Sequence, residues 1–408
     1  MARRWEEWGW KTMLPVEVTV GTRGWRERLK QTFLVTFPAL LLCLALDFVG
    51  GGVLGKNFEM IATSYPLLLI ILPGLSDLRG NVFGAMASRM TTALHLGKIR
   101  GILDKEVTTN ISMAIGSSKI PLIVLWIAGA VKLGFSHSAF VVLLIVIASA
   151  IVIGLLLGYS TAFITIFPYR WGADPDMIAA PLITSVADVI TIPTLVYLIF
   201  FYEDHETAFY AFTAIMIVLF VLLIFLSDYK KEHVRAFKEV SGVLTILALI
   251  EIFSGSTLES YSDVISKAII LSVMYPSILD SVGNFASIAA ATTSTRLNLS
   301  GKSALKNREF YLDVSALLLL TPIIGFLTNY IAVHVTRLIG HHAALIWPFI
   351  IGYPFLVMAN MAIGVFIAYL SHRFNIDPDN VAIPTVTTIS DVMGTLFVVL
   401  LAKVMVGA

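Results

Sequence analysis

The sequence has little charge and almost no cysteine. Asp, Glu, Lys and Arg make up 13% of its 408 residues, which is about half the share found in soluble domains. Its single cysteine, Cys43, excludes an intramolecular disulfide and any metal site built on several cysteines. The net charge of +1 gives no electrostatic reason to expect a nucleic-acid partner.

Hydrophobic residues are abundant instead. They make up 57% of the chain, and the mean hydropathy is +0.86. Many apolar runs reach about 20 residues, the length of a helix that crosses a bilayer. The pattern predicts an all-α polytopic membrane protein with about eleven spans: 32–54, 60–86, 112–132, 139–166, 179–201, 208–226, 240–256, 264–288, 312–335, 344–370 and 381–404.

The loops between these spans differ in basic charge from one side to the other. With the N-terminus inside, most loop Lys and Arg residues fall on the cytoplasmic side. The outer loops receive Lys56, Lys132, Arg337 and Lys403. The positive-inside rule therefore predicts a multi-pass protein of the inner or plasma membrane with a cytoplasmic N-terminus and an external C-terminus. The first run is too long for a cleavable signal. The Trp- and Arg-bearing segment 1–31 is expected either to lie at the cytoplasmic interface or to form a loosely ordered tail.

An internal repeat joins the two halves of the chain at a constant offset of 203 residues. Around one motif, the residues Asp174, Pro175, Asp176, Ala179, Pro181, Thr184 and Asp188 meet identical residues at Asp377, Pro378, Asp379, Ala382, Pro384, Thr387 and Asp391. About a hundred residues earlier, Pro73, Asp77, Gly80 and Asn81 meet Pro276, Asp280, Gly283 and Asn284 at the same offset. Matched Asp, Asn, Gly and Pro do not arise from hydrophobicity alone, so we interpret this as a duplication.

The repeat predicts the arrangement of the halves. Each copy contains five spans, and the extra span at 208–226 gives both copies the same orientation about a pseudo-twofold axis along the membrane normal. We divide the chain into an N-terminal segment (1–31), a first five-helix domain (32–206), a linker helix and loop (207–234) and a second five-helix domain (235–408).

The run from Leu72 to Asn81 resembles the second-helix signature of the MgtE family of magnesium transporters. The stretch from Asp174 to Asp188 is similar to the fifth-helix signature of that family. Two tandem copies resemble the solute-carrier relatives of MgtE, which fuse two such membrane domains. The resemblance implies a pore between the repeats within one polypeptide, so a monomer is expected to suffice where other members form homodimers. The chain lacks the cytoplasmic sensor domains of bacterial MgtE, which places the inheritance of their gating in doubt.

Two buried carboxylates are the strongest candidates for binding an ion. Asp188 and Asp391 lie about ten residues into their spans, and Thr184 and Thr387 precede them by one helical turn. Ionisable groups at this depth usually face a cavity or a partner. Because Mg²⁺ prefers oxygen ligands and keeps several waters, paired Asp and Thr residues fit a partly hydrated Mg²⁺ ion. The alternative is that each Asp bonds a helix end or a nearby Arg.

A second set of oxygen-bearing residues lies on the helices that carry the prolines. Asp77 with Asn81, and Asp280 with Asn284, are spaced four apart on one helix face. They predict either a second polar ring around the ion path or polar contacts that hold helices together.

Two further acid groups are expected at helix ends. Asp47 and Glu251 fall near the predicted outer ends of the first spans, and we expect interfacial carboxylates or, less simply, an entrance ring. The Asp-Pro pairs at 174–175 and 377–378 are expected to cap their helices.

Taken together, the residues predict a transporter of divalent cations, with Mg²⁺ as cargo and no cofactor. A sodium- or proton-coupled divalent cation exchanger is the alternative. An intramembrane enzyme is a remote one, because the sequence lacks His-Glu-x-x-His, Gly-x-Gly-Asp and Gly-x-Ser-x-Gly motifs.

Overall fold

The computed structural model describes residues 25–170, 176–300, 305–374 and 378–407, and these form helices without a strand. The earlier helices are α1 (Trp25–Ser64), α2 (Pro66–His95), α3 (Lys105–Ser117), α4 (Lys119–Leu133), α5 (His137–Arg170), α6 (Asp176–Asp204) and α7 (Glu206–Leu226). The later helices are α8 (Lys231–Ser260), α9 (Ser262–Ser266), α10 (Ile269–Ser300), α11 (Arg308–Leu338), α12 (Trp347–Arg373) and α13 (Pro378–Val406). The segment 1–24 lies outside the described residues.

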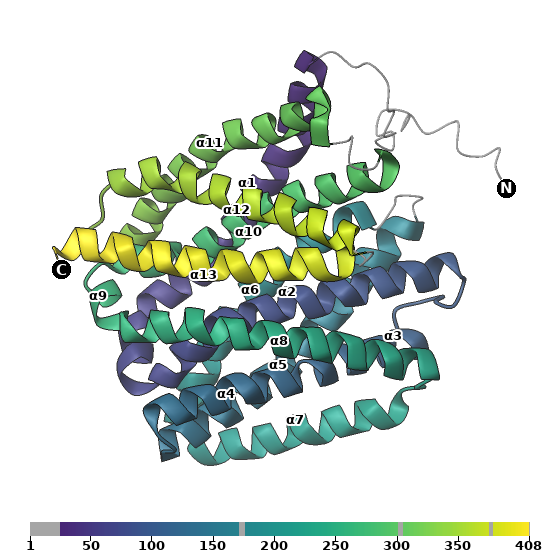
Figure 1. The fold of residues 1–408 in the computed structure, drawn as a ribbon. Helices are drawn as coiled ribbons and strands as arrows, with labels where there is room; N and C mark the ends of the chain where they lie inside the picture. Colours follow the sequence, from purple (N-terminus) through teal and green to yellow (C-terminus); the bar gives the residue numbers. More distant parts are fainter. Residues whose placement is uncertain (1–24, 171–175, 301–304, 375–377, 408) are drawn as a thin grey trace, which may run out of the picture.

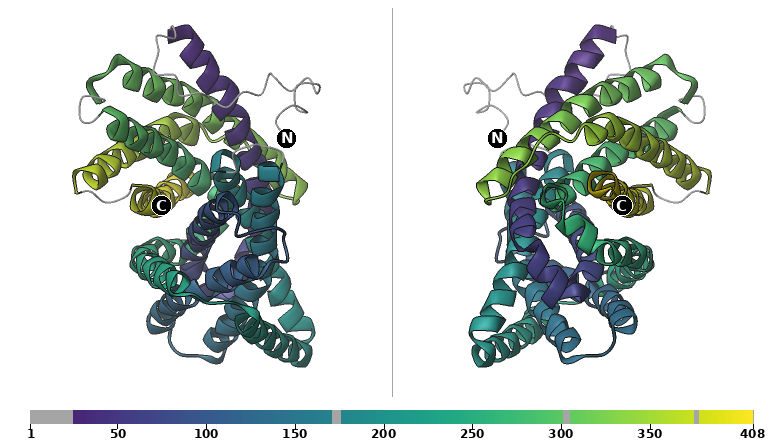
Figure 2. Two further views of the ribbon diagram at one scale, coloured as in Figure 1. Left: turned by 90° about the vertical axis from the view of Figure 1, so that its right-hand side faces the viewer. Right: turned by 90° about the vertical axis from the view of Figure 1, so that its left-hand side faces the viewer.

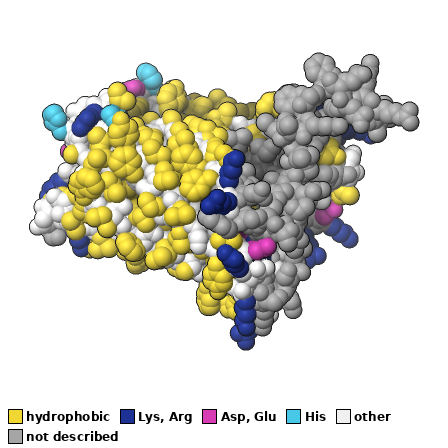
Figure 3. All heavy atoms as spheres, turned by 90° about the horizontal axis from the view of Figure 1, so that it is seen from above, with side chains coloured by type: hydrophobic (Ala, Val, Ile, Leu, Met, Phe, Trp, Pro, Cys, Tyr) yellow, Lys and Arg dark blue, Asp and Glu magenta, His cyan; other side chains and the backbone are white. Residues whose placement is uncertain are grey.

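The chain is a polytopic membrane protein. Within the described residues, ten segments are long and apolar enough to cross a bilayer, and α3 and α4 count together as one of them. The eleventh predicted span, 179–201, falls within α6, which runs from Asp176 to Asp204. The long helices lie side by side, with α7 at one edge and α11 at the other (Figure 1). Seen from above in Figure 3, a broad hydrophobic face lies between two ends where charged side chains gather.

Helix boundaries follow local chemistry. Pro66 begins α2 at a position where the missing N–H costs nothing. The Asn307 side chain caps α11 by accepting a hydrogen bond from the Glu309 N–H at 3.2 Å. Pro73 in α2 and Pro276 in α10 lie inside their helices, where each removes one backbone hydrogen bond and leaves a carbonyl without its usual partner.

The two halves exchange their first helices. The helix α1 packs on α10 and α11 of the later half, and α8 packs on α2 and α4 of the earlier half. The other equivalent pairs also match: α2 packs on α5 and α6 as α10 packs on α12 and α13. Five crossings lie between α1 and α8, namely α2, the α3–α4 pair, α5, α6 and α7, so α1 and α8 run in the same direction. Figure 2 shows the blue-to-teal helices on one side and the green-to-yellow helices on the other.

Glycines allow these exchanged helices to approach closely. A Cβ atom on Gly51 of α1 would lie 2.1 Å from the Val273 carbonyl oxygen of α10. A Cβ on Gly255 of α8 would lie 1.8 Å from the Ile70 carbonyl oxygen of α2. Val273 and Ile70 are equivalent at the offset of 203, whereas Gly51 and Gly255 are 204 apart. The first helices therefore repeat with one residue more than the rest.

The linker helix α7 is peripheral. Its buried residues are Phe209, Thr213 and Leu223, and it packs against α3, α5 and α6 of the earlier half. This position agrees with its expected topological role, since the extra crossing restores the direction of the second repeat.

Candidate functional site

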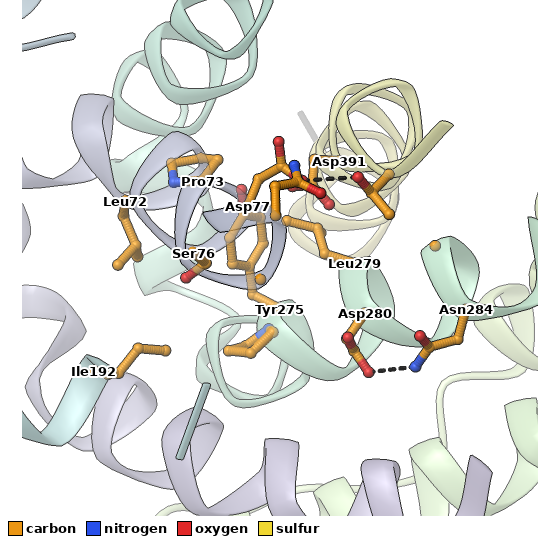
Figure 4. A pocket seen from close by; sticks show the side chains of 15 residues that line it. Leu72, Pro73, Ser76, Asp77, Ile192, Tyr275, Leu279, Asp280, Asn284 and Asp391 are labelled. Atoms are coloured by element: carbon orange, nitrogen blue, oxygen red, sulfur yellow. Dashed lines mark hydrogen bonds between the residues drawn. The ribbon is translucent and has the colours of Figure 1, made fainter. Parts of the chain in front are cut away.

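A cavity of about 90 Å³ lies where α2, α10 and α13 meet, with Ile192 contributed by α6. Figure 4 shows its lining, in which the carboxylates of Asp77, Asp280 and Asp391 come from three different helices. Most lining residues form pairs at the offset of 203: Leu72 with Tyr275, Pro73 with Pro276, Ser76 with Leu279, Asp77 with Asp280, Gly80 with Gly283 and Asn81 with Asn284. The cavity thus lies on the boundary between the two repeats.

Asp77 is held by donors from both halves. Its Oδ1 accepts hydrogen bonds from Asn81 Nδ2 at 3.0 Å and from Thr387 Oγ1 at 2.8 Å. Its Oδ2 accepts one from Thr388 Oγ1 at 2.7 Å. Charge-assisted hydrogen bonds of this kind stabilise an ionised carboxylate. They also fix α13 of the later repeat against α2 of the earlier one.

Asp280 has different surroundings, although it occupies the equivalent place. Asn284 Nδ2 donates to its Oδ2 at 2.6 Å, and its other near neighbour is the carboxyl group of Asp47 from α1. The two repeats therefore differ in hydrogen bonding: Asp77 accepts from two hydroxyl groups, whereas the side-chain partners of Asp280 are an amide and the carboxyl group of Asp47. The halves are not chemically equivalent.

The interpretation of Asp47 and Glu251 as carboxylates at outer helix ends is wrong. Asp47 is 0% exposed and Glu251 is 1% exposed. The helices α1 and α8 extend well past the predicted spans, so both residues lie inside the bundle. Asp47 interacts with Asp280, and Glu251 interacts electrostatically with Asp77. Each first helix therefore brings an acid beside the second-helix Asp of the opposite half.

Asp391 lines the cavity and is 8% exposed. One turn before it, Thr387 also lines the cavity while bonding Asp77. One turn after it, the Thr395 hydroxyl bonds both the Tyr275 and Ser254 hydroxyls at 2.8 Å. Thr387, Asp391 and Thr395 thus lie one turn apart along α13.

The sequence-predicted residues that the structure describes come together at this site: Asp77, Asn81, Asp280, Asn284, Thr387 and Asp391. The side chains of Thr184 and Asp188 lie outside the described residues, as do Asp174, Pro175 and Asp377 of the predicted caps, whereas Pro378 is the first residue of α13. Sequence reasoning missed the buried positions of Asp47 and Glu251. One signal in the sequence could have indicated their burial: Asp47 and Glu251 are 204 residues apart, the same spacing as the closely packed Gly51 and Gly255.

Arg79 distinguishes the first repeat from the second. It is buried and donates to Thr191 of α6 at 2.8 Å and to Ser149 of α5 at 3.4 Å. Its equivalent in the second repeat is Val282. Arg79 joins α2 to the outer helices of its own half.

Within the described residues, no group of three or more His, Cys, Asp and Glu side chains is arranged to hold a metal ion. The described site thus offers few carboxylates, together with hydroxyl and amide oxygens. Such a donor set matches a hard cation that keeps part of its water shell.

A helical membrane protein with an acid-lined cavity between two repeats belongs to the class of membrane transport proteins. The sequence profile of the MgtE family, described as "Divalent cation transporter", matches residues 72–198 and 275–401. The chain belongs to this family, with one matched segment in each repeat.

Similar proteins extend the match over most of the chain. Solute carrier family 41 member 3 of Rattus norvegicus is 26% identical over 90% of this chain and 86% of its own length. Member 3 of Mus musculus is 25% identical over 89% of this chain and 80% of its own length. Member 2 of Mus musculus is 24% identical over 90% of this chain and 68% of its own length. No solved structure gives a significant match.

Proposed function

We propose that this protein moves Mg²⁺ across the membrane through the cavity between its two repeats. The observation that carries the proposal is the convergence of Asp77, Asp280 and Asp391 on one cavity at the repeat boundary. A buried carboxylate costs about 2.5–3.5 kcal/mol on insertion scales. A cation in the cavity offsets this cost. In a membrane scaffold without an ion path, the buried carboxylates would keep the cost and serve no purpose.

The residues divide into two roles in this proposal. Asp391 and its equivalent Asp188 bind the ion, with Thr387 and Thr184 beside them. Asp77, Asn81, Asp280 and Asn284 face the water shell of the ion. Both oxygens of Asp77 already accept hydrogen bonds from Thr387, Thr388 and Asn81, so it acts on the ion through charge and water. Two direct carboxylates with several waters suit Mg²⁺, which loses its hydration shell reluctantly.

The proposal includes an arrangement in the membrane. Two five-helix domains, 32–206 and 235–408, surround the ion path and are connected by the linker helix and loop at 207–234. The excess of Lys and Arg in alternate loops supports a cytoplasmic N-terminus and an external C-terminus in the cell membrane. Since both repeats lie in one chain, a monomer contains the complete path.

Flux through proteoliposomes tests the assignment. We expect Asp391→Asn and Asp188→Asn each to lower Mg²⁺ flux at least tenfold, because each removes a charge that stabilises the ion. Asp263→Asn is the matched control, because Asp263 is exposed on α9, away from the cavity. Wild-type flux in both cavity variants, with an unchanged elution profile, would contradict the assignment. The same vesicles tested with Mn²⁺, Co²⁺ and Ca²⁺ determine selectivity.

A further inference from the structure

Glu251 is a buried acid that has no role in the ion path proposed above. Its side chain lies in the C-terminal half of α8 and is 1% exposed. Neither Oε1 nor Oε2 has a hydrogen-bond partner. It does not line the cavity. An ionised carboxylate in such a place carries a desolvation cost that nothing around it offsets.

The immediate surroundings of Glu251 are apolar and tightly packed. A Cβ on Gly74 of α2 would lie 3.0 Å from Glu251 Cβ and 2.9 Å from Leu125 Cδ1 of α4. Because no hydroxyl, amide or backbone group hydrogen-bonds the carboxyl group, the ligands that a sodium or magnesium ion requires are not in place. A proton needs neither ligands nor space.

Two electrostatic neighbours of Glu251, Asp77 and Tyr275, line the cavity and so have access to the ion path. On α2, Asp77 interacts with it electrostatically and also lines the cavity. On α13 and α10, Asp391 and Tyr275 belong to the same polar region, and Tyr275 interacts with both Asp391 and Glu251.

Other charges on helices packed against α8 bond groups away from Glu251: Arg89 of α2 donates to Asn110 at 3.2 Å, and Lys403 of α13 donates to Tyr261 at 3.2 Å. Lys132 of α4 bonds Glu259 at 2.6 Å, two turns further along α8. Glu106 of α3 bonds His233 at 2.9 Å near the start of α8. On α2, Arg79 is directed to α5 and α6. On α4, Lys119 lies over the Phe220 ring of α7. The short helix α9 adds Asp263, which is exposed beyond the end of α8.

We propose that Glu251 is a proton-carrying site whose proton is exchanged for the transported divalent cation. This inference rests on the proposed function and adds a coupling ion to it. A divalent cation beside Asp77 stabilises the ionised form of Glu251, and the proton leaves through the cavity. When the cation departs, Glu251 takes up a proton again. Each cycle thus moves a proton opposite to the cation, and no bond other than O–H is made or broken.

The equivalent position in the other half carries Asp47, beside Asp280. The proposal for Glu251 does not depend on this second site.

Proton and Mg²⁺ movements measured in the same proteoliposomes test the inference. The vesicles contain a pH-sensitive dye and a Mg²⁺-sensitive dye, and valinomycin with equal K⁺ on both sides sets the membrane potential to zero. In the wild type, we expect inward Mg²⁺ flux to alkalinise the lumen. Glu251→Gln keeps the shape of a protonated Glu, and we expect it to lower the number of protons moved per Mg²⁺ at least tenfold. Glu239→Gln is the control, because Glu239 is exposed on the same helix.

Each outcome decides the inference. Wild-type Mg²⁺ flux without any proton movement overturns the coupling while leaving the proposed function intact. An unchanged proton-to-Mg²⁺ ratio in Glu251→Gln overturns the assignment to Glu251. An absence of divalent flux in the wild type overturns the proposed function instead. If Glu251→Gln does not fold, the dependence of wild-type Mg²⁺ flux on an imposed pH gradient decides: a rate that stays within twofold over a gradient of two pH units contradicts the proposal.

Discussion

Replacing Gly255 by alanine tests the close packing of the exchanged first helices. The added Cβ would lie 1.8 Å from the Ile70 carbonyl oxygen and 2.8 Å from Ile70 Cα, whereas ordinary contacts begin at 3.4 Å, so α8 and α2 must separate by about 1.6 Å. All the atoms it meets belong to the backbone, which cannot rotate away. Overpacking of this kind costs about 1–3 kcal/mol or more, and we expect about 3 kcal/mol here.

The assay is thermal unfolding of the purified protein in detergent, followed by Mg²⁺ flux. A loss of about 3 kcal/mol lowers the melting temperature by about 3–4 °C for a chain of this length. Flux also falls, because the shift moves Glu251 away from Asp77. Gly242→Ala is the matched control on the same helix, because a Cβ there meets nothing within 4 Å. The reasoning is refuted if Gly255→Ala has the same melting temperature as Gly242→Ala and transports Mg²⁺ at the normal rate.

Three smaller perturbations follow from individual contacts. Thr388→Val removes the 2.7 Å hydrogen bond to Asp77 Oδ2, and we expect a loss of about 1–3 kcal/mol in unfolding experiments, since a buried carboxylate loses a donor. His233→Ala removes the acceptor of the Lys230 N–H at the start of α8, which should cost about 1 kcal/mol as a lost helix cap. Lys132→Gln breaks an outer ion pair, and we expect a change below about 1 kcal/mol in the same measurement.

Each of these has its own control and contrary result. Thr328→Val should be nearly neutral, because its hydroxyl bonds only the Ile324 carbonyl of its own helix, and equal losses in both Thr variants would contradict the role of Thr388. A stability of His233→Ala equal to that of wild type would show that the cap contributes nothing. If Lys132→Gln destabilised the protein as much as Thr388→Val, the ranking of buried over outer contacts would be wrong.

Hydrophobic runs and the repeat predicted the helices and the residues that meet at the cavity. Asp77, Asp280 and Asp391 were identifiable because a duplication retained polar residues in one register inside apolar segments, where their burial is costly. The periodicity of a helix then places Thr387 on the same face as Asp391. These inferences need only local geometry and one symmetry relation.

The burial of Asp47 and Glu251 could not be predicted in the same way. Hydropathy set the predicted spans at 32–54 and 240–256, but α1 runs from Trp25 to Ser64 and α8 from Lys231 to Ser260. Polar residues at both ends continue these helices, so an apparent helix end lies inside the bundle. The exchange of first helices between the halves depends on the glycine contacts of Gly51 and Gly255, which are tertiary. Hydropathy contains no information about such crossings.

The central claim is that the divalent cation passes through the cavity between the repeats. A cysteine in the cavity tests it directly, on a Cys43→Ala background that removes the single native thiol. Ser76 lines the cavity, whereas Ser138 is exposed at the start of α5. Because Cd²⁺ is a small divalent ion that binds thiolates, it should block Mg²⁺ flux through Ser76→Cys and spare Ser138→Cys, with excess Mg²⁺ slowing the block. Equal Cd²⁺ sensitivity of the two variants, or unimpeded flux through both, would contradict the account.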